Sequence, residues 1–220
     1  MLVGSGGFAR ETAAAVRAIN ETQPTWALIG YVDDDPSTWG RTLDGVEVLG
    51  PIGSLHDYRD ASIVVCTGRP DNYFSRAHIT ATLGVPDRRY ATIIHPAASV
   101  SADSTVGPGS VLLAGVVLTA NCQVGSHVAV MPGAVITHDD VLEDYVTLGA
   151  RVCLGGGARI GRGAYLGSGV LVREALSVGE WSMIGMGAVL LRDVPAAEIW
   201  YGVPARCHGS VDVPSALAVV

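Results

Sequence analysis

A run of polar residues, Thr137-His138-Asp139-Asp140, interrupts an otherwise apolar stretch of this chain. A neutral imidazole can take a proton from an attacking amine or hydroxyl near pH 7, and an adjacent carboxylate can hold its tautomer and stabilise the imidazolium. Eighteen residues further on lies a glycine triplet, 155–157, whose backbone N–H groups are open to the oxyanion of a tetrahedral intermediate. The pattern predicts acyl transfer with His138 as the general base. The alternative is a solvated turn in which aspartates cap backbone amides.

A six-residue repeat must position these groups. Every sixth residue from 100 to 190 is Val, Leu or Ile, the next residue is often Gly, and the fourth residue after each aliphatic is small or apolar. Such a repeat is typical of a parallel β-helix with three short strands and eighteen residues per coil, in which the aliphatic side chains point inward. His138 then faces outward, one coil from Gly156, and Asp140 occupies an inward corner. The repeated aliphatics are Val100, Val106, Leu112, Leu118, Val124, Val130, Ile136, Leu142, Leu148, Leu154, Ile160, Leu166, Val172, Val178, Ile184 and Leu190.

The first 90 residues have a different pattern, in which short apolar strands alternate with helices. We expect strands at 2–3, 27–32, 62–66 and 90–94, and helices at 7–20, 51–58 and 71–83. This order predicts a small parallel sheet with helices on its faces. The expected fold class is therefore a small Rossmann-like α/β domain (1–92), an all-β parallel β-helix (93–196) and a C-terminal tail (197–220). The six-residue repeat resembles that of hexapeptide-repeat acyltransferases, and this resemblance implies a left-handed β-helix.

The N-terminal domain opens with a glycine-rich turn, Gly4-Ser5-Gly6-Gly7, between the first strand and the first helix. Backbone amides at a helix N-terminus favour phosphate, and the acidic cluster Asp33–Asp35 at the next strand end can accept hydrogen bonds from a ribose or base. The domain is small, so a mononucleotide group fits the prediction better than a dinucleotide. The alternative is a tight connection without a ligand.

Composition narrows the function further. A net charge of −7 argues against nucleic acid or an anionic membrane as the main partner, and the absence of lysine excludes a lysine base or Schiff base. No apolar run reaches the ~18–20 residues of a membrane span, and no secretion signal is recognised. The four cysteines are widely spaced, which favours reduced thiols in a cytoplasmic protein. Only His127 and His138 lie in the coils, so a three-histidine zinc site is disfavoured and no metal is expected.

The sequence segments GSGGFARE, YVDDDP, IIHPAASV, THDD and RDVPAAEIWYGVPARC together resemble the NeuD/PglD family of sialic-acid and nucleotide-amino-sugar acetyltransferases. The resemblance spans almost the whole chain. It implies a homotrimer with sites between neighbouring β-helices, acetyl-CoA as the donor, and an acceptor with a UDP-type or other nucleotide group bound by the N-terminal domain.

The resemblance also implies roles for individual residues. His138 matches the base, Asp139 its partner carboxylate, and Gly156 the amide that faces the acetyl carbonyl. For the acceptor and its nucleotide we assign Gly4, Gly6, Gly7, Asp33, Asp34 and Gly68. For CoA we assign Gly155, Gly156, Ala164, Arg173, Arg192 and Arg206, where the arginines pair with phosphates unless they are simply solvated surface charges.

Three residues depart from the family pattern: Thr147 stands where a second histidine is common, Met131 where an asparagine is common, and Asp140 where a cysteine or alanine is common. An inward-facing Asp140 is expected to be partly protonated. We predict a CoA-dependent acyltransferase, most simply an acetyltransferase, acting on an amino or hydroxyl group of a nucleotide-linked sugar or related small molecule. Two alternatives stay open: a non-catalytic nucleotide-sensing or scaffold trimer of the same fold, and a nicotinamide oxidoreductase.

Overall fold

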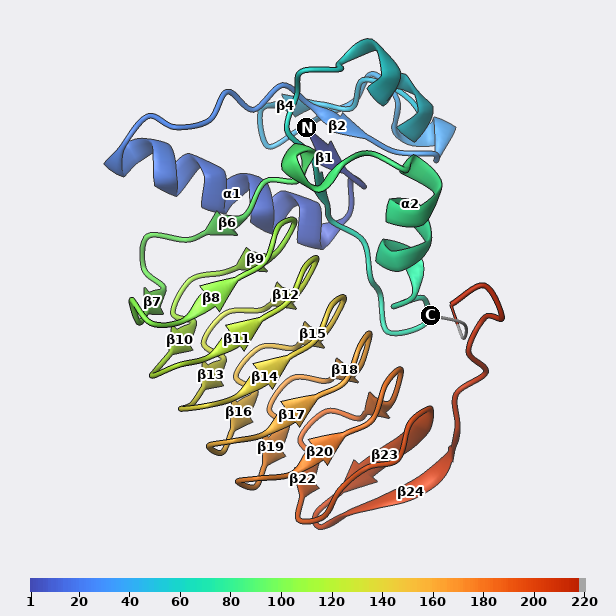
Figure 1. Cartoon of the computed structure of the whole chain (residues 1–220). Coiled ribbons are helices and arrows are strands. Elements are labelled where there is room, and N and C mark those ends of the chain that lie inside the picture. Colours follow the sequence, from blue (N-terminus) through green and yellow to red (C-terminus); the bar gives the residue numbers. More distant parts are fainter. Residues whose placement is uncertain (218–220) are drawn as a thin grey trace.

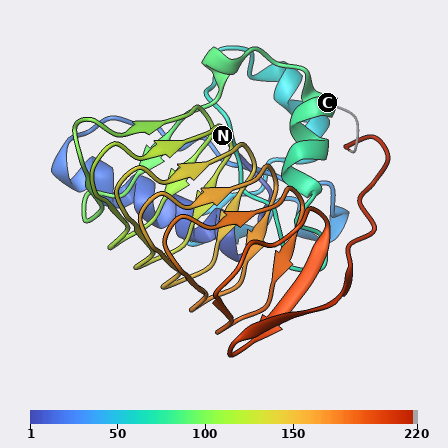
Figure 2. The same cartoon turned by 60° about the horizontal axis from the view of Figure 1, so that its bottom comes forward.

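In the computed structural model, which describes residues 1–217, a small α/β region lies at one end of a long stack of β-coils (Figure 1). The chain passes from the N-terminal region into the coils and then returns toward helix α2 through its last described residues (Figures 1 and 2). Among the described residues no helix is both long and apolar enough to cross a membrane.

The N-terminal sheet has three parallel strands in the order β2 (Tyr31–Val32), β1 (Leu2–Val3) and β5 (Val64–Val65). We expected longer outer strands, at 27–32 and 62–66. The central strand sets the limit: Gly4 follows it with a φ of +97° and ends it after two residues, so each neighbour pairs over only two positions. A hairpin of β3 (Thr42–Leu43) and β4 (Val46–Glu47) lies beside this sheet.

Two α-helices accompany the sheet. Helix α1 (Gly7–Thr22) begins directly after the glycine turn and buries the face that carries Ala9, Ala13 and Val16. Helix α2 (Ser75–Leu83) starts four residues later than expected, because residues 69–72 first form a tight turn. Three short 3₁₀ segments complete the region: η1 (Pro36–Thr38), η2 (Ile52–Asp57) and η3 (Asp87–Arg89).

The coils form a three-sided prism, and each pair of stacked strands is related by eighteen residues, as in the pairs Val117↔Val135 and Gln123↔Val141. The aliphatic ladder is inside: from Leu112 to Leu190 every ladder residue is buried, most of them completely. The fourth residue after each ladder position is also inside, at the corners. The prediction of a parallel β-helix with three short strands and eighteen residues per coil is therefore confirmed, and each strand is two residues long. Its strands are β7 (Ser99–Val100), β8 (Thr105–Val106), β9 (Val111–Leu112), β10 (Val117–Leu118), β11 (Gln123–Val124), β12 (Ala129–Val130), β13 (Val135–Ile136), β14 (Val141–Leu142), β15 (Thr147–Leu148), β16 (Cys153–Leu154), β17 (Arg159–Ile160), β18 (Tyr165–Leu166), β19 (Leu171–Val172), β20 (Ser177–Val178), β21 (Met183–Ile184) and β22 (Val189–Leu190).

We name the three sides of the prism by their strands. Side 1 stacks β7, β10, β13, β16, β19 and β22, and side 2 stacks β8, β11, β14, β17 and β20. Side 3 stacks β9, β12, β15, β18 and β21, with β6 (Ile93–Ile94) added at one end. At the other end β23 (Glu198–Gly202) and β24 (Ala205–Ser210) extend side 3 as an antiparallel hairpin within the segment that we had expected to be a tail. Helix α1 of the N-terminal region packs on β6, which belongs to side 3 of the prism. The two regions are therefore in contact at this point of the chain, and the domain boundary at residue 92 stays a prediction.

The N-terminal region lies against side 3 and is held there by Arg76 of helix α2. This guanidinium is almost completely buried and donates to the backbone carbonyl oxygens of Thr67 (2.7 Å), His127 (3.0 Å) and Tyr145 (2.9 Å). It also donates to the hydroxyl of Thr147 at 2.6 Å. One side chain therefore links helix α2, the loop after β5 and two coils.

Candidate active site

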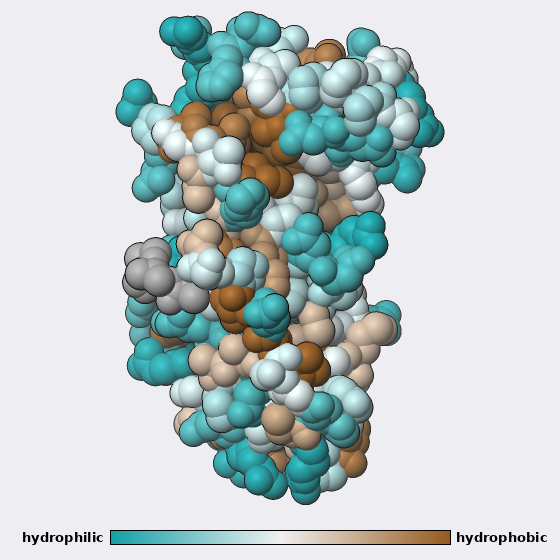
Figure 3. All heavy atoms as spheres, turned by 90° about the vertical axis from the view of Figure 1, so that its right-hand side faces the viewer, coloured by the Kyte–Doolittle hydropathy of each residue, from teal (hydrophilic) through white to brown (hydrophobic). Residues whose placement is uncertain are grey.

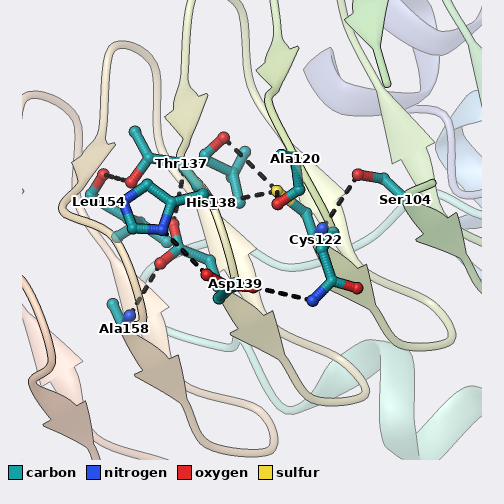
Figure 4. Close-up of polar contacts among 11 residues, drawn as sticks. Ser104, Ala120, Cys122, Thr137, His138, Asp139, Leu154 and Ala158 are labelled. Carbon is teal, nitrogen blue, oxygen red and sulfur yellow. Dashed lines mark hydrogen bonds and ion pairs between the residues drawn. The ribbon is translucent and has the colours of Figure 1, made fainter. Parts of the chain in front are cut away.

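His138 and Asp139 lie on the corner between side 1 and side 2, where the chain passes from β13 to β14 (Figure 4). The His138 side chain is 67% exposed, as the repeat predicts, and its Nδ1 is 3.0 Å from Oδ2 of Asp139. The corner requires a positive φ at Asp139 (+63°), a conformation that aspartate and asparagine adopt more readily than most residues. With Nδ1 held by the carboxylate, the Nε2 atom is the one available to accept a proton.

We call the coil that precedes a residue in the chain the coil below it and the coil that follows it the coil above it, although Figure 1 draws the first coils at the top. Asn121, one coil below, completes this arrangement. Its amide nitrogen donates to Oδ1 of Asp139 at 2.8 Å, so each carboxylate oxygen of Asp139 is engaged by a different partner. The hydrogen bond from Asn121 and then that from His138 lower the pKa of Asp139 below its usual range. The carboxylate is therefore ionised wherever it must orient and stabilise the imidazole.

Gly156 lies next to His138 on the coil above. A Cβ atom at this position would collide with Nε2 of His138, so the backbone at 156 approaches the reactive edge of the imidazole closely. In the part of the chain that the structure describes, the amide of Gly156 donates no hydrogen bond. Gly156 therefore brings a free N–H into the neighbourhood of His138, as an oxyanion donor requires.

Asp140 points into the prism at the same corner and is fully buried. Its Oδ2 accepts from the amide of Thr137 at 2.7 Å, and its Oδ1 accepts from the amide of Ala158 at 2.8 Å. Burial raises the pKa of this carboxyl to about 6, in agreement with the expected partial protonation, while the two amide hydrogen bonds act in the opposite direction.

The six residues that we assigned to the acceptor lie together in the N-terminal region. They line a cavity of about 520 Å³, together with the side chains of Phe8, Ile52 and Ile79; the six are Gly4, Gly6, Gly7, Asp33, Asp34 and Gly68. The cavity opens at the N-terminus of helix α1, where Gly6 is the cap and no side chain occupies the first amides. A volume of this size suits a small organic ligand. In Figure 3, hydrophobic atoms (brown) are visible on the surface of the N-terminal region, at the top of the view.

The two aspartates of the cavity differ in how much of their hydrogen-bonding capacity is used. Asp33 accepts from the amide and hydroxyl of Ser5 (2.7 and 2.6 Å) and from the amide of Asp35. Among residues 1–217, Asp34 accepts only from the amide of Ile52, at 2.9 Å, and its side chain is exposed. Since a carboxylate can accept about four hydrogen bonds, Asp33 mainly shapes the glycine turn and Asp34 is freer to contact a ligand.

The residues assigned to CoA are distributed along the prism. Two of them lie on the same corner as His138, because they follow it at multiples of eighteen residues: Gly156 on the next coil and Arg192 two coils beyond that. Glu174, which was not assigned to CoA, lies on the coil between them. Arg173, Arg192 and Arg206 are exposed. Ala164 is different: its side chain is fully buried inside the prism, so only its backbone is open to contact.

Two of the three departures from the family pattern lie away from His138. Thr147 is buried on side 3, where its hydroxyl accepts from Arg76. Met131 packs against the apolar core of the N-terminal region. Both residues therefore fasten the N-terminal region to the coils, and of the three departures only Asp140 belongs to the corner that carries the base.

Sequence reasoning missed two residues of this architecture. Asn121 carried a signal, because it stands eighteen residues before Asp139 and the repeat places it directly beneath that carboxylate. Arg76 carried none, since its partners lie in three separate segments. Among the described residues, no three His, Cys, Asp or Glu side chains gather in a way that could hold a metal ion.

Comparisons with known proteins agree with this geometry. No family model matches the sequence, and a search of curated proteins gives no match either. Solved structures do match. PerB from Caulobacter crescentus in complex with CoA and GDP-perosamine is 30% identical, with 94% of this chain and 96% of that chain covered and a TM-score of 0.82.

Two further structures are equally similar. The acetyltransferase domain of PglB from Neisseria gonorrhoeae in complex with acetyl coenzyme A is 30% identical, with 94% and 97% of the two chains covered and a TM-score of 0.82. A histidine-to-alanine variant of the C. crescentus GDP-perosamine N-acetyl transferase, with CoA and GDP-perosamine, is 28% identical over 95% and 96%, with a TM-score of 0.83.

These similarities extend over both regions of the molecule. They confirm the expected fold class, a short α/β region followed by a left-handed parallel β-helix, and the expected class of protein. The chain is an acyltransferase and belongs to the NeuD/PglD-like family of hexapeptide-repeat sugar acyltransferases.

Proposed function

We propose that this enzyme transfers the acetyl group of acetyl-CoA to the amino group of a nucleotide-linked sugar, with His138 as the general base. The observation that carries the proposal is the arrangement at the corner of the prism. An exposed imidazole is oriented by Asp139, and its Nε2 edge lies close to the backbone of Gly156, whose amide donates no hydrogen bond in the described structure. The similar proteins were solved with CoA, acetyl-CoA or GDP-perosamine, which supports the same donor and class of acceptor here.

The reaction needs one base and one oxyanion donor. The acceptor nitrogen attacks the thioester carbonyl carbon and gives up a proton to Nε2 of His138, while Asp139 stabilises the imidazolium that forms. The Gly156 amide donates a hydrogen bond to the carbonyl oxygen and stabilises the negative charge that develops there. As the carbon–sulfur bond breaks, the imidazolium returns the proton to the departing CoA sulfur. No covalent acyl-enzyme is required. The only cysteine in the His138 corner, Cys122, is buried, and burial raises the pKa of its thiol.

The cavity in the N-terminal region binds the nucleotide of the acceptor in this proposal. The first amides of helix α1 suit a phosphate group, and Asp34 retains capacity for ribose or base hydroxyl and amino groups. Along the His138 corner, Arg192 lies three coils above the base, about 14 Å away at the usual strand spacing. That position suits a phosphate of CoA.

The two halves of the site face different sides of one chain. The acceptor cavity belongs to the region that covers side 3, whereas His138 is on the corner between sides 1 and 2, across the prism. A second copy must therefore bring its cavity to the base. Side 1 suits this contact because its outward strand residues other than Ser99 are apolar, whereas those of side 2 are mostly polar. The outward apolar residues of side 1 are Val117, Val135, Cys153, Leu171 and Val189. We propose a homotrimer with its sites between neighbouring β-helices.

The proposal is tested with a panel of nucleotide-linked amino sugars that differ in the nucleotide: UDP, GDP and dTDP. Release of CoA thiol from acetyl-CoA is followed together with the mass of the sugar product. Thiol release that depends on one amino sugar, with a mass gain of one acetyl group, supports the proposal. Nucleotide binding without any acetyl-CoA binding would instead support the non-catalytic sensing or scaffold alternative.

A further inference from the structure

Asp140 is the one inward-facing carboxylate of the described coils, and it alters the backbone pattern of the repeat at two places. The inward residues at this corner form a column with one residue per coil, spaced eighteen residues apart. Besides Asp140, this corner column holds Ser104, Cys122, Ala158, Leu176 and Val194. None of these side chains carries a charge. The inference that follows rests on the acetyl transfer proposed above.

The first alteration is in the strand pairing directly before His138. One coil below, the amide of Thr119 donates to the carbonyl of Ile136 at 3.0 Å, and the corresponding bond from Thr137 would go to Leu154. In the structure the Thr137 amide turns inward to Asp140 instead, and the Thr137 hydroxyl takes over the Leu154 carbonyl at 2.9 Å. β13 and β16 consequently pair only at Val135↔Cys153, whereas the other neighbouring strands of side 1 pair over two positions.

The second alteration is in the glycine turn that carries Gly156. At many corners the inward residue donates its amide to the carbonyl three residues earlier, as Val152 does to Gly149 and Ala164 to Gly161. In the column of Asp140 two amides donate instead to the inward side chain of the preceding coil. The Cys122 amide donates to the Ser104 hydroxyl at 3.0 Å, and the Ala158 amide donates to Asp140 at 2.8 Å. Three consecutive glycines have unusual backbone freedom, so an external anchor at the end of the turn limits the positions that they adopt.

From these contacts we propose that Asp140 is a positioning residue for acetyl transfer. One carboxylate holds the turn of His138 through the Thr137 amide and the turn of Gly156 through the Ala158 amide, and so it fixes the distance between the base and the oxyanion donor. Both contacts are visible at the corner in Figure 4, where dashed lines reach Thr137 and Ala158.

The electrostatic surroundings agree with this role. The titratable groups that face Asp140 are His138 and Asp139 on its own turn and Cys122 on the coil below, while the coil above presents only Ala158. Burial places the pKa of Asp140 at about 6, so near neutral pH the carboxylate has both oxygens free to accept. A buried carboxylate is costly for folding, whereas the next coil holds a smaller, uncharged side chain, that of Ala158, at the same place in the corner column.

The test replaces Asp140 with the residue found one coil above, in the variant Asp140→Ala. The Thr137 amide can then return to the usual pattern of the repeat, and the buried carboxylate is removed, so we expect a folded protein with an unchanged or higher melting temperature. The two turns shift relative to each other, and kcat falls about 10- to 100-fold, the cost of a misplacement of about 1 Å, with KM for both substrates unchanged. Asp140→Asn keeps one acceptor oxygen and should lie between the variant and the parent enzyme.

Ser110→Ala is the matched control. The Ser110 hydroxyl also accepts an amide from the coil above, that of Val128 at 2.9 Å, but at a different corner from His138. We expect its kcat to stay within about twofold of the parent enzyme. If Asp140 only supported the fold, kcat and melting temperature would fall together in Asp140→Ala, and that result would overturn the proposal, as would an unchanged kcat.

A crystal structure of Asp140→Ala gives a readout that does not depend on activity. We expect the Thr137 amide to bond to the Leu154 carbonyl, with the pair Ile136↔Leu154 restored. Turns that keep their present geometry without the carboxylate would refute the positioning role. If the parent enzyme transfers no acetyl group, the proposed function fails, and this structure still decides whether Asp140 shapes the corner.

Discussion

Replacing Arg76 with methionine should loosen the N-terminal region from the coils without unfolding the β-helix. Methionine fills much of the same volume but removes every hydrogen bond of the guanidinium. In the described structure no amide donates to the carbonyl oxygens of Thr67, His127 and Tyr145, so Arg76 is their sole hydrogen-bond donor there. Each carbonyl left buried without a donor costs about 1–3 kcal/mol.

Part of that cost is offset, because the variant no longer buries a charge. Burial without a carboxylate partner already lowers the pKa of Arg76 to about 10, which shows that the charged form is held against a desolvation penalty. We expect a net loss of about 3–4 kcal/mol for the contact between helix α2 and side 3. Local opening then becomes about 10²- to 10³-fold more frequent, since 1.4 kcal/mol is a factor of ten.

Hydrogen exchange measured by mass spectrometry tests this expectation. In Arg76→Met, amides of helix α2 (75–83) should exchange about 10²- to 10³-fold faster, while the coils from β16 onward stay protected. Arg89→Met is the matched control, because Arg89 also donates to two carbonyls, those of Ala61 and Tyr58, but only within the N-terminal region. Equal exchange of helix α2 in the two variants, or in Arg76→Met and the parent, would refute the interpretation of Arg76 as the link.

Three further predictions concern the corner of the prism. Asn121→Ala removes one hydrogen bond from Asp139 and should lower kcat about 3- to 10-fold without changing the melting temperature; a kcat equal to that of the parent enzyme would show that Asp139 needs no support. Gly156→Ala places a Cβ against Nε2 of His138 and should lower kcat about 10²-fold, yet in a His138→Ala background the same change should have little further effect, and additive losses would contradict the contact. Because the folded state raises the pKa of Asp140 from an ordinary value of 3.8 to about 6, its proton is bound more tightly in the folded state. Stability should therefore fall by about 2.5 kcal/mol as pH rises from 4 to 7, a dependence that denaturant unfolding should find absent in Asp140→Ala.

The β-helix could be predicted from sequence because its determinants are local and repeated. The aliphatic at every sixth position and the small residue four places later specify which side chains point inward, and the structure buries them accordingly. The same periodicity placed His138 outside and Asp140 inside. It also contained the contact between Asn121 and Asp139, which follows from counting eighteen residues back.

Other features depend on contacts between distant segments, which periodicity does not encode. The strands of the N-terminal sheet are short because Gly4 ends β1, and this limits strands that lie thirty and sixty residues away. The repeat does not say which side of the prism the N-terminal region covers, so the burial of Thr147 and Met131 was not foreseen. Likewise, no local pattern marks Arg76, whose partners lie in three segments.

The central claim is that His138 is the base of a CoA-dependent acetyl transfer. The most direct measurement is the rate of acetylation of a nucleotide-linked amino sugar by His138→Asn, in which the side chain stays polar but cannot take the proton. The account predicts that kcat falls about 10²- to 10⁴-fold, while acetyl-CoA and the sugar bind as in the parent enzyme and the oligomer stays intact. A His138→Asn variant that acetylates the sugar at the parental rate would contradict it.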